Sequence, residues 1–390
     1  MIIRRNISGH IRKMLEQFPI VSLTGPRQSG KTTLLKTDFP EYKYYNLERL
    51  DHREMISADP LGFLYSVGIK VIFDEVQNLP DLFSYIQVVS DERSIPGQYI
   101  LSGSQSFLLN ERISQSLAGR VNINQLLPFD ITELDSLKNL SIEQVIFKGF
   151  YPRLYDYNIS PQDFYPSYLQ TYIERDIRTL KAVENLQSFS RFLSLCAGRI
   201  GQVLNLSSLA NDAGIAVNTA KSWLSLLESS YIIYFLQPYY RNYNKRLIKS
   251  PKLYFYDTGV ASSLLKLSNP GMVGSHYLYG ALFENLIISE IIKFNYHSGK
   301  RPLVYYWRES NGMEIDCIIE RGHNEIVVLE IKGGQTFSKD FLKNLKNFPQ
   351  GDSSIKTSKM LLYAGDSAYQ SADIQVTNWK KFPSLIEQLI

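Results

Sequence analysis

The feature that most constrains the fold is a glycine-rich loop that follows a short apolar run. Residues 20–24 read IVSLT, residues 25–32 read GPRQSGKT, and the helix-like stretch KTTLLKTDF continues from the loop. An apolar run that stops at Gly-Pro is typical of a buried strand. The spacing G-x-x-x-x-G-K-T is that of a phosphate-binding loop between a strand and a helix. The sequence therefore predicts an α/β domain built on a parallel sheet.

The loop offers the groups that hold a nucleoside triphosphate. Gly25 and Gly30 let backbone N–H groups wrap the phosphates, and the helix that follows directs its positive end at them. Lys31 would neutralise β- and γ-phosphate oxygens, and the Thr32 hydroxyl would ligate Mg²⁺. We therefore predict that ATP and Mg²⁺ bind here; the alternative is a glycine turn that binds nothing. The predicted binding residues are Gly25, Pro26, Arg27, Gln28, Ser29, Gly30, Lys31, Thr32 and Thr33.

An apolar strand that ends in two acids supplies the partner of this loop. Residues 71–75 read VIFDE. Asp74 would hold the Mg²⁺ ion, and Glu75 would orient and deprotonate the attacking water, which favours hydrolysis over tight storage of nucleotide. Ser102 and Ser104 follow the next strand and could sense the γ-phosphate. The alternative reading is solvated acids and small polar turn residues at strand ends.

Arg120, in SQSLAGRVNI, is a candidate arginine finger. Such an arginine stabilises the transition-state charge of phosphoryl transfer and acts within its own subunit or from a neighbour. An ordinary surface arginine is the alternative.

The pattern along the chain changes twice. Strand-like runs alternate with helix-like stretches up to about residue 160, and amphipathic helices follow from 161. Within the helical region, a turn at Gly214 between two helices gives a helix-turn-helix outline. A long helix around ALFENLIISEIIKF then precedes further strands. The expected domains are 1–160, a P-loop ATPase domain; 161–252, a helical and winged-helix segment; and 253–390, an α/β domain.

These stretches resemble a family of prokaryotic AAA+-type ATPases. The matching pieces, over about residues 18–335, are GPRQSGKTTLL, IFDEVQ, SGSQSFLL, SLAGRV, YIERDI, LYFYDTGV, GALFENLIISEI and EIDCIIE…VVLEIK. The resemblance implies an AAA+-like core, a winged-helix middle segment and a C-terminal domain similar to the PD-(D/E)xK, or restriction-endonuclease-like, fold. GFYPRL at 149–154 departs from the family, because Arg153 stands where relatives often have an acid.

Two β-like runs near the C-terminus carry the acids of a possible cleavage site. Residues 310–334 read SNGMEIDCIIERGHNEIVVLEIKGG. Antiparallel pairing across the turn would bring Asp316 to Glu330, with Lys332 on the same strand face as Glu330. Two carboxylates could hold a metal ion that activates water, and the lysine could stabilise the nucleophile or the developing charge. Glu284 could approach as a further acid. The alternative is charges on the edge of a sheet.

Residues 241–252, RNYNKRLIKSPK, are a candidate contact for nucleic acid. They hold five basic residues and no acid, with tyrosines interleaved, after the helix-turn-helix. A basic wing of this kind could bind phosphates of DNA or RNA. A solvated hairpin in a domain that only packs is the alternative.

Composition limits the remaining possibilities. The net charge of +4 neither requires nor excludes nucleic acid. Cys196 and Cys317 have no motif spacing and lie in apolar surroundings, so we expect two buried thiols and no disulfide. Apolar runs such as YIIYFL at 231–236 are too short for a bilayer, so we expect no membrane partner and a cytoplasmic location. A homo-oligomer is possible. We predict an ATPase whose C-terminal region engages and may cleave nucleic acid, with two alternatives: a signalling or scaffold ATPase that binds proteins, or a small-molecule kinase.

Overall fold

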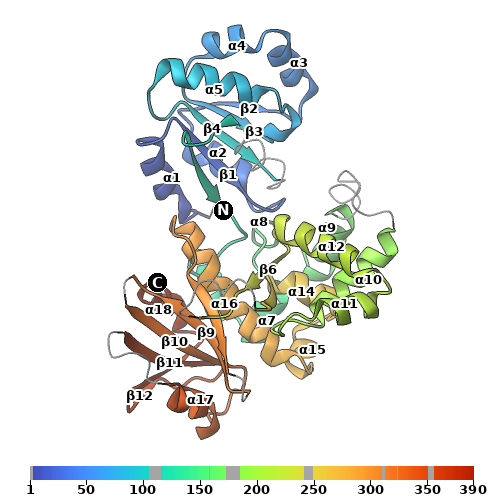
Figure 1. Ribbon diagram of the computed structural model, residues 1–390, viewed down its shortest axis with the longest axis vertical. Helices are drawn as coiled ribbons and strands as arrows, with labels where there is room; N and C mark the ends of the chain where they lie inside the picture. The colour runs from blue at the N-terminus through green and yellow to red at the C-terminus, as the bar shows by residue number, and fades with distance from the viewer. Residues whose placement is uncertain are drawn as a thin grey trace. The chain divides into compact units, whose positions relative to one another are not determined.

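The structure, a computed structural model, divides into two compact units (Figure 1). The first unit comprises residues 1–129, 229–231 and 296–300, and the second comprises 130–228, 232–295 and 301–390. The long first segment of this unit ends at Phe129, whereas the expected boundary lies at residue 160. The structure describes residues 3–104, 116–157, 159–172, 185–240, 249–309, 312–322, 324–349 and 355–390.

A five-stranded sheet forms the centre of the first unit. All its neighbouring strands are parallel, in the order β2-β3-β4-β1-β5, so that β4 separates β1 from β3. This confirms the predicted parallel α/β domain. The strands are β1 (Ile20–Thr24), β2 (Lys43–Asn46), β3 (Val71–Asp74), β4 (Tyr99–Gly103) and β5 (Val121–Gln125).

Helices cover both faces of this sheet because its central strands carry apolar residues on both faces. Val71 and Phe73 of β3 pack in one buried cluster with residues of α4 and α5. Ile72, between them, packs in the other cluster with residues of α1 and α2. The helices are α1 (Ile7–Leu15), α2 (Lys31–Asp38), α3 (Leu50–Ala58), α4 (Pro60–Val67) and α5 (Leu82–Arg93).

The second unit begins with helices and contains the predicted helix-turn-helix. Helix α11 ends at Gly214, whose φ of +71° suits a glycine after a helix, and α12 starts at Val217. Strands β6 (Ile233–Leu236) and β7 (Lys252–Phe255) follow as an antiparallel pair. The expected boundary at 252 thus falls inside a strand pair. The helical elements are η2 (Ile131–Glu133), η3 (Asp135–Asn139), α7 (Ile142–Lys148), α8 (Arg153–Asp156), α9 (Pro161–Tyr172), α10 (Leu186–Ala197), α11 (Leu206–Ala213), α12 (Val217–Ser229), α14 (Thr258–Leu264), α15 (Pro270–Ser275) and α16 (Tyr279–His297).

A separate mixed sheet of six strands completes the second unit. Its order is β12-β13-β11-β10-β9-β8, and β10 pairs antiparallel with β9 and parallel with β11. The short helix α17 packs on this sheet through Leu345. The elements are β8 (Val304–Arg308), β9 (Glu314–Glu320), β10 (Glu325–Lys332), α17 (Lys343–Asn347), β11 (Lys356–Tyr363), β12 (Tyr369–Ser371), β13 (Ile374–Asn378) and α18 (Phe382–Leu389).

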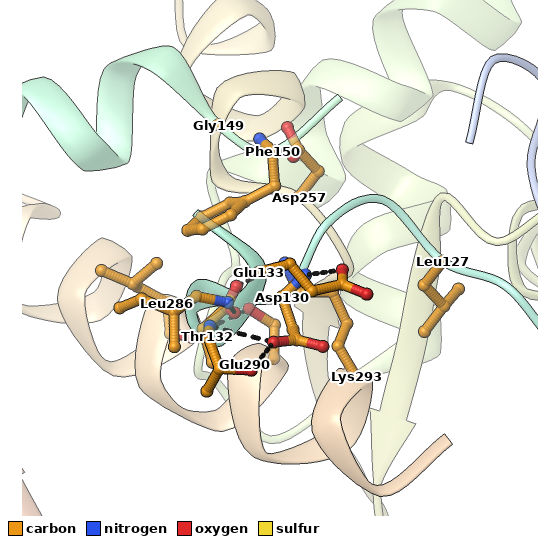
Figure 2. A network of polar contacts seen from close by, with 12 residues as sticks. Leu127, Asp130, Thr132, Glu133, Gly149, Phe150, Asp257, Leu286, Glu290 and Lys293 are labelled. Carbon is orange, nitrogen blue, oxygen red and sulfur yellow. Dashed lines mark hydrogen bonds and ion pairs between the residues drawn. The ribbon is translucent and has the colours of Figure 1, made fainter. Parts of the chain in front are cut away.

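Helix α16 carries two fully buried ionisable side chains that anchor the start of the second unit (Figure 2). Glu290 and Lys293 contact each other, and both are 0% exposed. Glu290 Oε2 accepts the N–H of Ile131 at 2.5 Å. The Lys293 ammonium lies 3.8 Å from the ring centre of Phe150. This network fixes the position of α16, which also carries Glu284.

Two simple expectations can be compared directly with the described residues. Cys196 and Cys317 are buried and form no disulfide, as predicted. Among the described helices, none combines the length and apolar character that crossing a bilayer requires.

Candidate nucleotide site and acidic cluster

The loop between β1 and α2 has a conformation that depends on glycine. Gly25 has a φ of +154° and Gly30 a φ of +94°. A Cβ atom on Gly25 would lie 2.0 Å from the carbonyl oxygen of Leu126, so only glycine fits there. Gln28 is also left-handed, with a φ of +61°. Left-handed residues in a turn direct successive N–H groups to one side, which is how anion-binding loops are built.

Lys31 lies inside this loop. Its ammonium donates to the carbonyl oxygens of Gly25 at 2.9 Å and Pro26 at 2.8 Å. The Ser29 hydroxyl is buried and has no hydrogen-bond partner among the described residues. A buried cation and an unsatisfied hydroxyl in a glycine-rich turn fit a bound phosphate.

The other predicted loop residues occupy the rim. Arg27 lies 3.8 Å from Glu48, and Thr33 is exposed on the first turn of α2. The nine predicted residues therefore form one continuous loop and helix start.

Asp74 lies under the loop, at the end of β3. Its Oδ2 accepts the hydroxyl of Thr32 at 2.7 Å and that of Tyr44 at 2.5 Å, and its Oδ1 accepts the hydroxyl of Ser102. Thr32 and Asp74, predicted as Mg²⁺ ligands from positions 42 residues apart, are thus in direct contact. Burial raises the pKa of Tyr44, and the hydrogen bond to Asp74 raises it further, so Tyr44 stays a donor.

Glu75 adopts a left-handed conformation with a φ of +55°, unusual for a residue with a side chain. Its Oε2 accepts the Ser104 hydroxyl at 2.9 Å and the Gln77 amide at 2.5 Å. Backbone strain of this kind often marks functional positions. The serines predicted as phosphate sensors instead hold the two acids: Ser102 contacts Asp74, and Ser104 contacts Glu75.

Arg120 is not near the loop of its own subunit. It precedes β5, and its carbonyl oxygen accepts the N–H of Ile20, the first residue of β1. The loop follows the opposite end of β1, five residues on, about 17 Å along a strand. The Arg120 guanidinium pairs with Asp91, donating to Oδ2 at 2.8 Å. In this structure Arg120 therefore does not reach the loop of its own subunit, and its role as an arginine finger, in cis or in trans, stays a prediction.

Asp316, Glu330 and Lys332 come together in the second unit as predicted. Strands β9 and β10 are antiparallel, with Leu329 opposite Cys317. Asp316 Oδ2 accepts the N–H of Ile331 at 2.8 Å and lies 3.2 Å from Lys332 Nζ. Lys332 also lies 2.7 Å from Glu330 Oε1.

A second acid–lysine group adjoins this one, and we call the whole set the acidic cluster: Lys252, Glu284, Glu314, Asp316, Glu330 and Lys332. Glu284 accepts the hydroxyl of Tyr254 and lies 3.3 Å from Lys252 Nζ. Glu314 lies 2.5 Å from the same ammonium. Glu314 and Asp316 are two residues apart on β9 and therefore lie on one face of that strand, which joins the two groups.

Two acids of the cluster, Glu284 and Glu330, hold their protons unusually tightly. Burial raises the pKa of Glu284 and of Glu330, each to about 7, and the charge of Asp316 adds to both shifts. Burial lowers the pKa of Lys332, but Asp316 and Glu330 outweigh it, so the net pKa is raised. The lysines therefore stay charged while two acids titrate near neutrality, a pattern common at functional sites.

The position of Lys252 contradicts part of the prediction that residues 241–252 form a basic wing. It is 2% exposed and paired with Glu284 and Glu314, so it does not contact phosphates as part of a basic wing. Lys249 is exposed. The other basic residues of that stretch, Arg241, Lys245 and Arg246, lie outside the described residues.

Sequence reasoning missed three residues of these sites. Tyr44 binds Asp74 from β2, and Asn344 donates to Glu330 Oε1 at 3.0 Å from α17. Lys252 was noticed only as one of a run of positive charges. None of the three stands in a motif: the pairing of β2 with β3 brings Tyr44 to Asp74, whereas Asn344 and Lys252 reach their partners only through tertiary packing.

Comparison with known proteins identifies the first region by family. Residues 17–135 match an AAA domain family, residues 139–271 a domain of unknown function (DUF8612), and residues 279–382 a domain of unknown function (DUF4143). An uncharacterized protein of Mycobacterium tuberculosis is 29% identical over 325 residues, which are 82% of this chain and 72% of that protein. An uncharacterized protein of Methanocaldococcus jannaschii is 24% identical over 438 residues, 99% of this chain and 88% of that protein.

Among solved structures, the Walker-type ATPase PABY2304 of Pyrococcus abyssi is similar with a TM-score of 0.44 and 17% identity, covering 67% of this chain and 96% of that one. The family match and the loop geometry agree for the first unit. The chain carries an AAA-type P-loop domain.

Proposed function

We propose that the chain is a Mg²⁺-dependent, ATP-hydrolysing AAA+-type ATPase whose second unit engages nucleic acid and cleaves it. The observation that carries the proposal is the contact of Thr32 with Asp74, 2.7 Å, directly beneath a loop that encloses Lys31. These are the groups that P-loop enzymes place around the metal and the β- and γ-phosphates. The AAA family match over residues 17–135 supports the same reading.

Each side chain has a role that follows from its position. Lys31 would exchange its bonds to the Gly25 and Pro26 carbonyls for bonds to phosphate oxygens. Bound Mg²⁺ would neutralise charge on those oxygens, with Thr32 and Asp74 as the residues that hold it. Glu75, fixed by Ser104, would accept a proton from the attacking water.

The acidic cluster supports the proposal of phosphodiester cleavage. Asp316 and Glu330 would hold a divalent cation, which lowers the pKa of bound water. Lys332, between the two acids, would stabilise negative charge that develops on the phosphate. The Glu330 Oε2 atom is buried without a hydrogen-bond partner among the described residues, which fits a metal ligand.

ATP turnover by the full chain, with and without single- and double-stranded DNA and RNA, tests the proposal. Lys31→Ala should abolish ATP binding, whereas Lys13→Ala, an exposed lysine on α1, should not change it. Nucleic acid should raise the turnover of wild type. Wild-type protein that fails to bind ATP with Mg²⁺ present would refute the ATPase assignment.

Cleavage needs its own measurement. Wild type should nick plasmid DNA or cut RNA with Mg²⁺ or Mn²⁺, and Asp316→Asn should remove this activity. Asp340→Asn, an exposed aspartate in the same unit, is the matched control. No cleavage of any substrate by wild type would contradict the nuclease part alone.

The second candidate is a signalling or scaffold ATPase whose second unit binds proteins without cutting. One observation favours it: Lys252 and Lys332 already neutralise part of the acidic cluster. ATP turnover that does not respond to any nucleic acid, together with absent cleavage, would support this alternative.

A further inference from the structure

Lys252 holds a position in the acidic cluster that no motif predicts. Its ammonium lies 2.5 Å from Glu314 Oε1 and 3.3 Å from Glu284 Oε1, and the residue is 2% exposed. The ring centre of Tyr306 lies 5.5 Å from the same ammonium. One positive charge is thus shared by two carboxylates away from solvent, as a bound cation would be.

The backbone fixes this lysine. Lys252 opens β7, where it is paired with Leu236 of β6, and it also forms a bridge with Val203. Pairing on both sides holds the main chain of Lys252 in place, and the ion pairs with Glu284 and Glu314 hold its ammonium group. The ammonium is therefore a permanent part of the cluster.

The two lysines divide the four acids between them. Lys252 pairs with Glu284 and Glu314, and Lys332 pairs with Asp316 and Glu330. With every acid ionised, the four carboxylates and the two lysine ammonium groups leave two negative charges, and the half-exposed Arg308 guanidinium lies 3.8 Å from Glu314 on the Lys252 side. One divalent cation would balance this net negative charge, and two would exceed it.

The unsatisfied atom indicates where this cation would bind. Glu330 is 1% exposed, and its Oε2 is buried without a hydrogen-bond partner among the described residues. Its Oε1 contacts Lys332, which in turn contacts Asp316. The free coordination capacity therefore lies on the Asp316 and Glu330 side, while Lys252 occupies the Glu284 and Glu314 side.

We infer that Lys252 acts as a built-in cation that limits the acidic cluster to one divalent metal ion, bound by Asp316 and Glu330. Lys252 takes the place that a second ion would have between Glu284 and Glu314. This inference rests on the proposed metal site of the second unit. It assigns Lys252 as a positioning residue that sets metal stoichiometry.

Mn²⁺ binding to the full chain, without nucleotide, tests the inference by calorimetry and by the electron paramagnetic resonance signal of free Mn²⁺. Wild type should bind one ion that is lost in Asp316→Asn. Lys252→Met should bind one ion more than wild type. Lys252→Arg should keep the wild-type number, and so should Lys249→Met, an exposed lysine just before β7.

Loss of Lys252 leaves two partly buried acids without their shared cation, so a second variant controls for misfolding. Lys252→Met combined with Glu284→Gln removes one charge of each sign and should bind the wild-type number of ions. If folded Lys252→Met binds no additional Mn²⁺, the inference is overturned while the metal site stands. If wild type binds none and Lys252→Met binds one, the proposed Asp316 and Glu330 site fails while the role of Lys252 is supported.

Discussion

Replacing Glu290 by glutamine should change how the stability of the second unit depends on pH. Glu290 has no exposed surface, and it contacts Lys293 and the backbone of Ile131. Burial raises its pKa to about 8, although the Lys293 charge pulls it down. The folded state therefore binds a proton on Glu290 at a pH where the unfolded chain has released it.

The direction and size of the effect follow from this shift. A carboxyl group whose pKa is raised on folding stabilises the fold at low pH, and this contribution is lost as pH rises through the folded pKa. The pKa of Glu290 is 4.5 in the unfolded chain and about 8 in the folded state. The free energy of unfolding should therefore fall by on the order of 4 kcal/mol from pH 5 to pH 9. Glutamine does not titrate, so the free energy of unfolding of Glu290→Gln should not show this decrease. At pH 5 the substitution should cost no more than about 1 kcal/mol.

Tryptophan fluorescence reports on the second unit alone, because the three tryptophans, Trp223, Trp307 and Trp379, all lie in it. Urea unfolding at pH 5, 7 and 9 gives the free energy of unfolding for each variant. Other acids titrate as well, so the informative quantity is the difference between wild type and Glu290→Gln. Glu387→Gln, an exposed glutamate on α18, is the matched control and should follow wild type.

If wild type and Glu290→Gln lose stability in parallel between pH 5 and pH 9, the reasoning is refuted. Lys293→Met provides a second check. Because the Lys293 charge lowers the pKa of Glu290, its removal should move the pH-dependent loss to higher pH.

Three further predictions concern the two sites. Glu75→Gln should keep ATP affinity and lower turnover by roughly 10²–10⁴-fold, since a general base is lost; unchanged turnover in a steady-state ATPase assay would exclude Glu75 as the base. Arg120→Ala should abolish turnover without weakening ATP binding. If Arg120 acts on a neighbouring subunit, a mixture of Arg120→Ala with the ATP-site variant Lys31→Ala should regain activity, and normal turnover by Arg120→Ala alone would remove Arg120 from the mechanism. Mn²⁺ affinity at Glu330 should fall about tenfold per pH unit below its pKa of about 7, because the metal competes with the proton; affinity independent of pH between 5 and 7 argues against Glu330 as a ligand.

The nucleotide site could be predicted because its residues are close in sequence or follow from a simple rule. Gly25 to Thr32 form one continuous loop, and Asp74 ends a strand of the same parallel sheet. Carboxyl ends of parallel strands meet at one edge, so the contact between Thr32 and Asp74 needed no knowledge of the register. The pair of Asp316 with Glu330 followed in the same way from a short antiparallel turn.

The sequence does not predict positions that depend on tertiary placement. The position of Arg120 follows only from the register of β5 against β1, which puts it at the strand end opposite the loop. Lys252 belongs to a run of positive charges, yet it meets Glu314, 62 positions away, inside the fold. Glu290 and Lys293 look like an ordinary surface pair three residues apart on a helix, but Phe150 and Ile131 cover them.

Helix α16 carries two acids whose partners lie in different parts of the second unit, so the length of helix between the two acids is fixed. Glu284 faces Lys252, and Glu290, six residues later, faces Ile131. One residue inserted between them would turn one end of the helix by about 100° relative to the other and lengthen it by about 1.5 Å. Either acid would then lose its partner, whatever residue were inserted. Homologous chains should therefore vary in the identity of residues along this segment far more readily than in their number.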